Sequence, residues 1–197
     1  MTETKLAAVV MAGGLGTRMR SATPKHLHPI LGRRMVDWVV EAARPLGPAR
    51  LVVIASPESR DAFGEVEVAV QERALGTGDA VRSTRAALEG SADDVLVLSG
   101  DTPLLTTALL AELLQAHRAS GAAATVLTFV PDDVRSYGRV LRGEDGRVRA
   151  IVEAGDATPE ELEVRECNSS IYVFRSELLW PADNAQEASH PGSRSEA

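Results

Sequence analysis

The sequence predicts an α/β fold, a doubly wound and mostly parallel sheet sandwiched by helices, with an added β-hairpin. Short apolar runs rich in β-branched residues alternate along the chain with longer stretches of helical period, the pattern of repeated strand–helix units. The strand runs are continuously apolar rather than alternating, so both faces of the sheet should be buried under helices. The predicted strands cover residues 6–11, 50–55, 66–70, 94–99 and 123–129.

Residues 35–47 predict the first amphipathic helix. It should end near Pro45 and Gly47, since proline cannot continue a helix and glycine often terminates one. The residues expected on its apolar face are Met35, Trp38, Val39 and Ala42.

Residues 106–121 predict the second amphipathic helix. Thr106 or Thr107 is the expected N-cap, because a hydroxyl oxygen can accept from the free N–H groups of the first turn, and Gly121 is the expected stop. The residues expected in its apolar stripe are Leu109, Leu110, Leu113 and Leu114.

After Pro131 the pattern changes to that of a hairpin. Residues 137–156 contain two short strands joined by a Glu-Asp-Gly turn, and residues 168–179 return to strand and helix. We expect one domain over residues 1–180, which is an ordinary domain size. Residues 181–197 contain no large aliphatic or aromatic residue, and we expect them to be disordered.

The charge distribution favours a small anionic ligand. The formal net charge is −7, which repels polyanions and argues against nucleic acid or an anionic membrane surface as a partner. Residues 17–34 nevertheless contain no acidic residue, and their cations are Arg18, Arg20, Lys25, Arg33 and Arg34.

The single cysteine and the short N-terminal apolar run indicate a reducing, cytoplasmic location. The single cysteine, Cys167, cannot form an internal disulfide and should be a small packed apolar residue. The apolar run at residues 6–12 is too short to span a bilayer. His26 and His28 lack metal-ligand neighbours, so we expect structural roles for them. The sequence does not predict an oligomeric state.

The segment from Met11 to Lys25, MAGGLGTRMRSATPK, follows a strand and combines glycines with cations. Bare backbone N–H groups in such a loop can approach a phosphate closely. A Walker A loop would need a Gly-Lys pair, which this segment lacks. A dinucleotide-binding fingerprint would need glycine or alanine where Met19 stands, so that match is weak. A tight structural turn with incidental surface cations is the simplest alternative.

A carboxylate follows the apolar strand at residues 94–99. Asp101 would lie at the carboxyl edge of a parallel sheet, where ligands bind in open α/β folds. Mg²⁺ usually takes one or two carboxylates together with substrate phosphates. The alternative is that Asp101 caps the following turn, whose geometry Pro103 sets.

The motifs together resemble a known family. In order, GTRMRSATPKHLHPILGRRM, QERALGTGDA, SGDTPL, YGRV, IVEAGDAT and ECNSSIY are similar to the uridylyltransferase domain of the bifunctional N-acetylglucosamine-1-phosphate uridylyltransferase/glucosamine-1-phosphate acetyltransferases. The resemblance implies an Mg²⁺-dependent nucleotidyltransferase that forms UDP-N-acetylglucosamine, a peptidoglycan precursor, and pyrophosphate from UTP and N-acetylglucosamine 1-phosphate.

In such a transfer the substrate supplies the nucleophile, so the protein need only position groups and neutralise charge. Arg18 would contact the triphosphate and the leaving pyrophosphate, and Lys25 would hold the phosphates near the attacking group. The implied nucleotide-binding residues are Met11, Ala12, Gly13, Gly14, Gly16, Lys25, Gln71, Gly76 and Thr77. The implied sugar-binding residues are Gly100, Asp101, Gly138, Glu153 and Asn168, and Asp101 is also the implied metal ligand.

The sequence departs from the family pattern at several positions. Ala74 stands where the family commonly has glutamine or proline, Asp79 where it has histidine, and Asn168-Ser169-Ser170 where it has Asn-Thr-Gly. The resemblance ends near residues 183–186, without a match for a second metal ligand or for the acetyltransferase domain. A fragment, an interrupted reading frame and a minimal variant all remain open. The alternatives in function are another sugar-phosphate or molybdenum-cofactor nucleotidyltransferase, and an inactive nucleotide-binding module.

Overall fold

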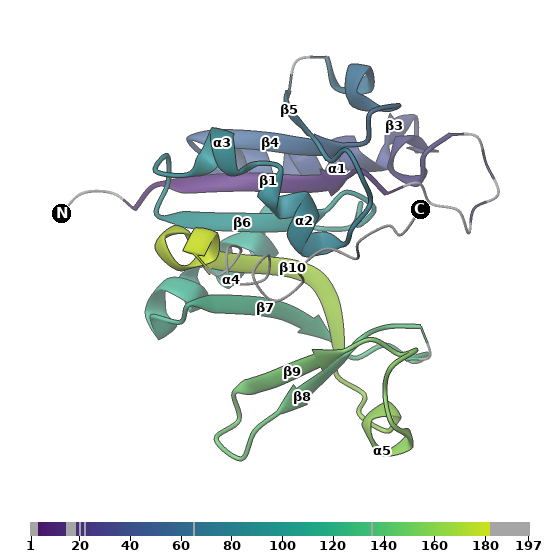
Figure 1. The fold of residues 1–197 in the computed structure, drawn as a ribbon, viewed down its shortest axis with the longest axis vertical. Coiled ribbons are helices and arrows are strands. Elements are labelled where there is room, and N and C mark those ends of the chain that lie inside the picture. Colours follow the sequence, from purple (N-terminus) through teal and green to yellow (C-terminus); the bar gives the residue numbers. More distant parts are fainter. Residues whose placement is uncertain are drawn as a thin grey trace, which may run out of the picture. The chain divides into compact units, whose positions relative to one another are not determined.

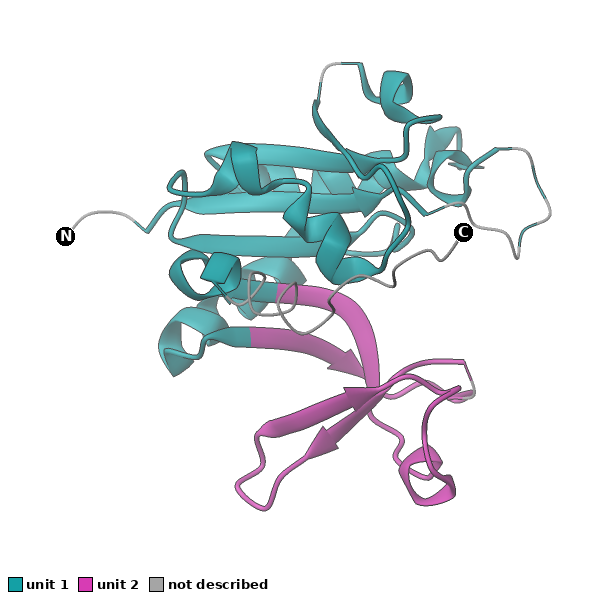
Figure 2. Ribbon diagram, viewed as in Figure 1, with its two compact units in different colours: residues 1–124, 173–197 teal, residues 125–172 magenta. Residues whose placement is uncertain are grey.

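The computed structural model describes residues 4–14, 19, 21, 23–64, 66–134 and 136–181. The chain divides into two compact units (Figure 2). The first unit comprises residues 1–124 and 173–197, and the second comprises residues 125–172. Strand β10 (Cys167–Arg175) supplies residues to both units. The disorder predicted for residues 181–197 is wrong at Pro181, which ends a helical turn, and the rest of that prediction falls outside the described residues.

Four parallel strands form the centre of the first unit (Figure 1). Their order in the sheet is β5 (Glu67–Val70), β4 (Arg50–Ala55), β1 (Leu6–Ala12) and β6 (Asp94–Ser99). Met11 of β1 pairs with Ile54 on one side and with Ser99 on the other. The carboxyl ends of the three central strands therefore meet at one edge, as the sequence predicts.

Helices cover both faces of this sheet. In Figure 1, α2 (Thr77–Arg82) and α3 (Arg85–Leu88) lie in front of the sheet, and α1 (Met35–Ala43) and α4 (Thr107–Ser120) lie behind it. The residues of β1 from Ala7 to Val10 are fully buried as a result. The predicted α/β fold is confirmed. The short elements of this unit are η2 (Lys25–Leu27), β2 (Pro29–Ile30), β3 (Arg33–Arg34), η3 (Arg44–Leu46), η4 (Arg60–Phe63) and a helical turn at residues 176–181.

The predicted apolar face of α1 is wrong at Met35 and Trp38. Both are only partly buried, and the core-facing residues are Val36, Val39, Val40, Ala42 and Ala43. The Trp38 indole donates to the carbonyl oxygen of Ile30 (3.1 Å), and the Arg33 guanidinium lies 4.9 Å from its ring centroid. Trp38 therefore packs on the β2–β3 ribbon, a contact that helical periodicity does not reveal.

The predicted apolar stripe of α4 is confirmed at Leu110, Leu113 and Leu114 and is wrong at Leu109. Thr106 is the N-cap, its hydroxyl oxygen accepting from the N–H of Leu109, and Gly121 ends the helix in a left-handed conformation, as expected. Leu109 is exposed, however, and the buried residues are Leu110, Leu113, Leu114 and His117. The spacing of these four is that of one helical face, and His117 fills a buried position of the stripe that the sequence analysis did not assign.

The second unit contains the predicted hairpin. Strand β8 (Arg139–Arg142) pairs antiparallel with β9 (Val148–Val152), and β8 also pairs antiparallel with β10. Strand β7 (Ala124–Phe129) pairs with β10. The short helix α5 (Pro159–Leu162) begins with a capping box made by Thr158 and Glu161.

Gly100 lets the chain after β6 approach β1 very closely. Its N–H donates to the carbonyl oxygen of Met11 (2.9 Å), and a Cβ at this position would lie 2.7 Å from the same oxygen. We expect Gly100→Ala to lower the free energy of unfolding by about 1–3 kcal/mol, because two backbone segments would have to separate. Urea denaturation measures this cost. Gly14→Ala is the control, since a Cβ at Gly14 meets nothing within 4 Å, and an equal loss in both variants would contradict the prediction.

Candidate active site

Lys25 and Asp101 form an ion pair near the carboxyl edge of the parallel sheet. The Lys25 Nζ lies 2.7 Å from the Asp101 Oδ2, and both side chains are partly exposed. The Ser99 hydroxyl donates to the Asp101 Oδ1 at 2.6 Å. The structure thus brings together the predicted phosphate-binding lysine and the predicted metal-binding carboxylate. The sequence reading missed Ser99, although its place in the Ser-Gly-Asp motif was the available signal.

The surroundings of Asp101 keep its carboxylate ionised. Burial opposes ionisation, but hydrogen bonds from Lys25 and Ser99 and the charge of Lys25 outweigh it and hold the pKa of Asp101 below its ordinary value. The site therefore presents one negative charge at neutral pH, held beside one positive charge.

The chain order places this edge at a topological switch point. From β1 the chain continues to β4 on one side, and it returns later to β6 on the other. Open α/β sheets bind ligands at such points, outside the carboxyl ends of the strands. The start of the glycine loop, Gly13 and Gly14, lies there directly after β1. Gly16 and Arg18 fall outside the described residues.

The Gln71 side chain connects two parts of the predicted nucleotide site, Gly13 of the glycine loop and Gly76 before α2. Its backbone N–H donates to the carbonyl oxygen of Ala55 (2.9 Å), which fixes it beyond the end of β4. The space over Gly13 is filled by the Gln71 Oε1, 3.3 Å from where a Cβ would stand. The Gln71 Nε2 donates to the carbonyl oxygen of Gly76 (3.2 Å), directly before Thr77 and α2. Gln71 therefore lies between Gly13 and Gly76, and Met11 and Ala12 lie at the end of β1, directly before Gly13.

Three of the predicted sugar-binding residues gather in the second unit. The Asn168 N–H donates to the carbonyl oxygen of Gly138 (2.9 Å), and a Cβ at Gly138 would lie 3.3 Å from the Glu153 Oε1. The other two predicted members, Gly100 and Asp101, belong to the first unit.

Tyr172 orients Asn168, a role that the sequence reading missed. The Tyr172 hydroxyl and the Ser170 N–H both donate to the Asn168 Oδ1, each at 3.0 Å. Burial and the charge of Glu153 raise the pKa of Tyr172 despite the bond to Asn168, so the hydroxyl stays a donor. Ser170 has a φ of 61°, a left-handed conformation that explains why the resembled family has glycine there.

Among the described residues, His26 and His28, which follow Lys25, do not belong to a cluster of metal ligands. His26 is buried, its ring stacks on that of Phe63 at 6.0 Å, and burial lowers the pKa of His26 to about 4. The ring is therefore neutral at pH 7 and belongs to the packing of η2. His28 contacts the carbonyl oxygen of Thr23 through its Nε2 at 3.1 Å. Cys167 is free and fully buried, as predicted.

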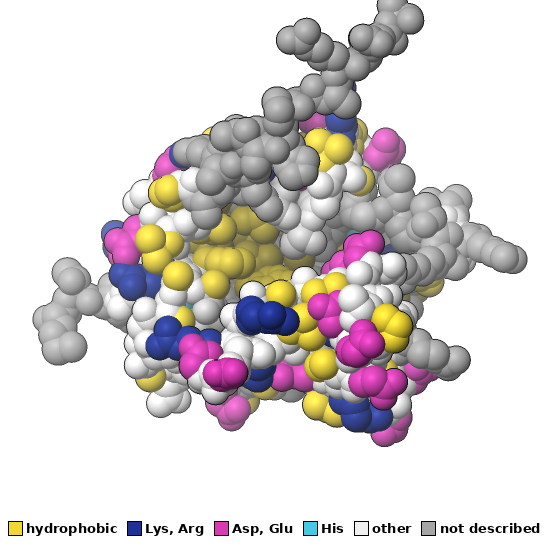
Figure 3. All heavy atoms as spheres, turned by 60° about the horizontal axis from the view of Figure 1, so that its bottom comes forward, with side chains coloured by type: hydrophobic (Ala, Val, Ile, Leu, Met, Phe, Trp, Pro, Cys, Tyr) yellow, Lys and Arg dark blue, Asp and Glu magenta, His cyan; other side chains and the backbone are white. Residues whose placement is uncertain are grey.

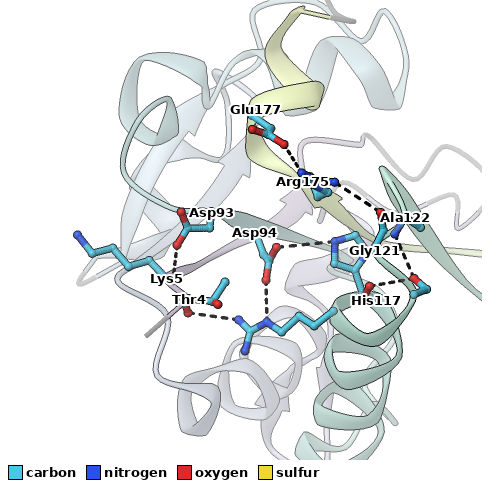
Figure 4. A network of polar contacts seen from close by, with 11 residues as sticks. Thr4, Lys5, Asp93, Asp94, His117, Gly121, Ala122, Arg175 and Glu177 are labelled. Atoms are coloured by element: carbon cyan, nitrogen blue, oxygen red, sulfur yellow. Dashed lines mark hydrogen bonds and ion pairs between the residues drawn. The ribbon is translucent and has the colours of Figure 1, made fainter. Parts of the chain in front are cut away.

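A second polar cluster lies at the opposite, amino-terminal edge of the sheet (Figure 4). Asp94, at the start of β6, accepts from the Arg118 Nε at 2.8 Å and lies 3.7 Å from the His117 Nε2. A neighbouring pair joins Arg175 to Glu177. These residues line a cavity of about 720 Å³, and their charged groups form ion pairs with one another.

The buried His117 predicts acid sensitivity of the fold. Burial lowers the pKa of His117, against the attraction of Asp94. The unfolded chain binds a proton below about pH 6.5 while the folded state resists it, so the free energy of unfolding should fall as the pH drops from 7 toward 5. Urea midpoints at several pH values should show a shallower pH dependence for His117→Gln than for the wild type. Identical slopes would contradict this assignment.

Within the described residues, no three or more histidine, cysteine and acidic side chains gather in a way that could hold a metal ion. The described helices include none long and apolar enough to cross a membrane. On the face drawn in Figure 3, apolar side chains gather in a central patch, and basic and acidic side chains are interspersed beside it.

Comparisons of the sequence with known proteins identify its family. Residues 8–157 match the MobA-like NTP transferase domain family, and the chain belongs to this family of nucleotidyltransferases, hence to an enzyme family. Among the individual proteins that the chain resembles are several called bifunctional protein GlmU. The resemblance predicted from the motifs is therefore confirmed.

Three of these relatives show the extent of the match. The chain is 47% identical to GlmU of Pelobacter propionicus over 193 residues, which cover 92% of the chain and 42% of the relative. It is 48% identical to GlmU of an Exiguobacterium species over 179 residues (89% and 40%) and 47% identical to GlmU of Mycobacterium tuberculosis over 180 residues (85% and 36%). The chain spans about two fifths of the length of these relatives.

Proposed function

We propose that the chain forms UDP-N-acetylglucosamine and pyrophosphate from UTP and N-acetylglucosamine 1-phosphate. The observation that carries the proposal is the Lys25–Asp101 pair at the switch point of the sheet. Gln71 lies beside Gly13 near the same edge. The similarity to the GlmU proteins supports this choice of substrates. The reaction would take place in the cytoplasm and supply a precursor of cell-wall peptidoglycan.

The chemistry asks little of the protein beyond placement and charge. A phosphate oxygen of the sugar phosphate attacks the α-phosphorus of UTP, the bond from that phosphorus to the bridging oxygen breaks, and pyrophosphate leaves. Lys25 offsets the negative charge of the phosphates as the transfer proceeds. Arg18, which lies outside the described residues, is proposed to act on the triphosphate in the same way.

Asp101 fits a magnesium ion held chiefly by substrate. It is one ionised carboxylate at the site, and Mg²⁺ commonly accepts one or two carboxylates, completing its shell with phosphate oxygens and water. Bound there, the ion would neutralise charge on the phosphate oxygens. Ser99 would keep the carboxylate oriented through its bond to the Oδ1.

Glu153 and Asn168 are proposed to bind the amino sugar. Glu153 can accept hydrogen bonds from sugar hydroxyls. The Asn168 oxygen accepts from the Tyr172 hydroxyl, so the NH₂ group of Asn168 faces away from Tyr172 and can donate to the sugar. Gly138 leaves room beside the Glu153 carboxylate.

One assay separates the candidate functions. Pyrophosphate release is measured with Mg²⁺ across a panel of nucleoside triphosphates and sugar phosphates. Turnover confined to UTP with N-acetylglucosamine 1-phosphate supports the proposal. Turnover with another pair would favour a different nucleotidyltransferase, an alternative to which the MobA-like family match gives weight. Nucleotide binding without release would indicate an inactive binding module.

A further inference from the structure

Asp79 lies against the side chain of Gln71. The Gln71 side chain is buried, and its Nε2 donates both to the Asp79 Oδ2 at 2.8 Å and to the carbonyl oxygen of Gly76 at 3.2 Å. Asp79 stands in the first turn of α2, where the Arg82 Nη1 lies 3.7 Å from its Oδ1. A carboxylate is thus held beside a buried amide.

These two partners fix which way the Gln71 amide faces. A carboxylate and a peptide carbonyl can only accept hydrogen bonds, so the NH₂ group of Gln71 must face them. Turning the amide would place its oxygen against two other oxygens in a buried position, which is unfavourable. The Gln71 Oε1 consequently faces the glycine loop, beside Gly13. Gln71 therefore offers an acceptor, and not a donor, to whatever lies there.

We propose that Asp79 is a positioning residue for base selection, holding Gln71 as an acceptor so that the site takes a base with an N–H at ring position 3. Uracil and thymine have this N–H, whereas the N3 of cytosine is an acceptor and would face the Gln71 oxygen. The inference rests on the proposed function and deepens it. It concerns the choice against cytosine, and it leaves uracil and thymine equivalent at this contact.

Calorimetric titration of the full chain with nucleotides and Mg²⁺ tests the role of Asp79. The wild type should bind UTP about 10- to 100-fold more tightly than CTP, and more tightly than 3-methyl-UTP by a similar factor, since each of the latter leaves the Gln71 oxygen without a donor. In Asp79→Asn the neighbour can donate as well as accept, so only the carbonyl oxygen of Gly76 still opposes turning of the Gln71 amide. The preference for UTP over CTP should then fall about tenfold.

Two further variants make the test specific. Asp79→Glu keeps an acceptor-only side chain and should retain most of the preference. Asp61→Asn removes a carboxylate whose side chain is 96% exposed and should leave the preference unchanged. A merely structural role for Asp79 would weaken UTP and CTP binding equally, and that result would overturn the inference.

The failures of the two proposals are distinguishable. If UTP binds and Asp79→Asn keeps the wild-type preference for it over CTP, the role of Asp79 is wrong and the proposed function stands. If no nucleotide binds to the wild type, the proposed function fails and the inference fails with it.

Discussion

Replacing Lys25 by alanine should lower the rate of pyrophosphate release by about 10²–10³-fold, the usual effect of losing one group that stabilises a transition state. The Lys25 ammonium lies at the carboxyl edge of the sheet, 2.7 Å from Asp101, where the proposed phosphates would bind. Its loss also leaves the Asp101 carboxylate without its cationic partner. Steady-state rates with saturating UTP and sugar phosphate measure the effect.

The chain offers a matched control for this substitution. Lys5 is exposed and lies by the polar cluster at the opposite edge of the sheet (Figure 4), so Lys5→Ala should leave the rate unchanged. We expect Arg18→Ala to be as damaging as Lys25→Ala. Full activity in both Lys25→Ala and Arg18→Ala would show that the phosphates bind elsewhere.

Asp101→Asn should reduce the rate by at least about 10²-fold and raise the Mg²⁺ concentration needed for half-maximal activity. Asparagine keeps the shape of aspartate. Its oxygen can still accept from Lys25 and its NH₂ group can donate to the Ser99 hydroxyl oxygen, so the variant should fold normally. What it lacks is the negative charge that would hold the cation. Initial rates over a range of Mg²⁺ concentrations measure both effects, and removing the metal with EDTA should abolish wild-type activity.

The pH dependence of the wild type adds a check on this assignment. Because the pKa of Asp101 lies below its ordinary value, the carboxylate stays ionised across neutral and mildly acidic pH, and its titration should not limit the rate there. If Asp101→Asn kept the Mg²⁺ dependence of the wild type, the carboxylate would have no part in holding the ion.

The strands and the edge of the sheet were predictable because their signals are local. Continuous apolar runs such as residues 94–99 indicate strands buried on both faces, and the parallel arrangement then places Asp101 near the glycine loop without knowledge of any contact. The contacts that were missed join segments distant in sequence or depend on turns. Trp38 packs on a two-stranded ribbon formed by an adjacent turn, and periodicity cannot register this.

The orientation of Gln71 was also beyond the sequence. The resemblance placed Gln71 among the nucleotide-binding residues, and both ends of its amide can form hydrogen bonds. Only the fold shows that Asp79 and the carbonyl oxygen of Gly76 take the donor end. Likewise, the unusual Ser170 signalled a departure from the resembled family, but its φ of 61° is what identifies the cost of that departure.

The second unit interrupts the first between residues 124 and 173. The two boundaries are close in space, because the N–H of Arg175, just after the second, donates to the carbonyl oxygen of Ala123, just before the first, at 3.0 Å. An insertion whose entry and exit are adjacent can be lengthened, shortened or exchanged without rethreading the host. The 125–172 segment is therefore a place where the chain can change in length or sequence while residues 1–124 and 173–181 keep their sheet, and joining residue 124 to residue 173 through a short linker is a direct way to isolate the first unit.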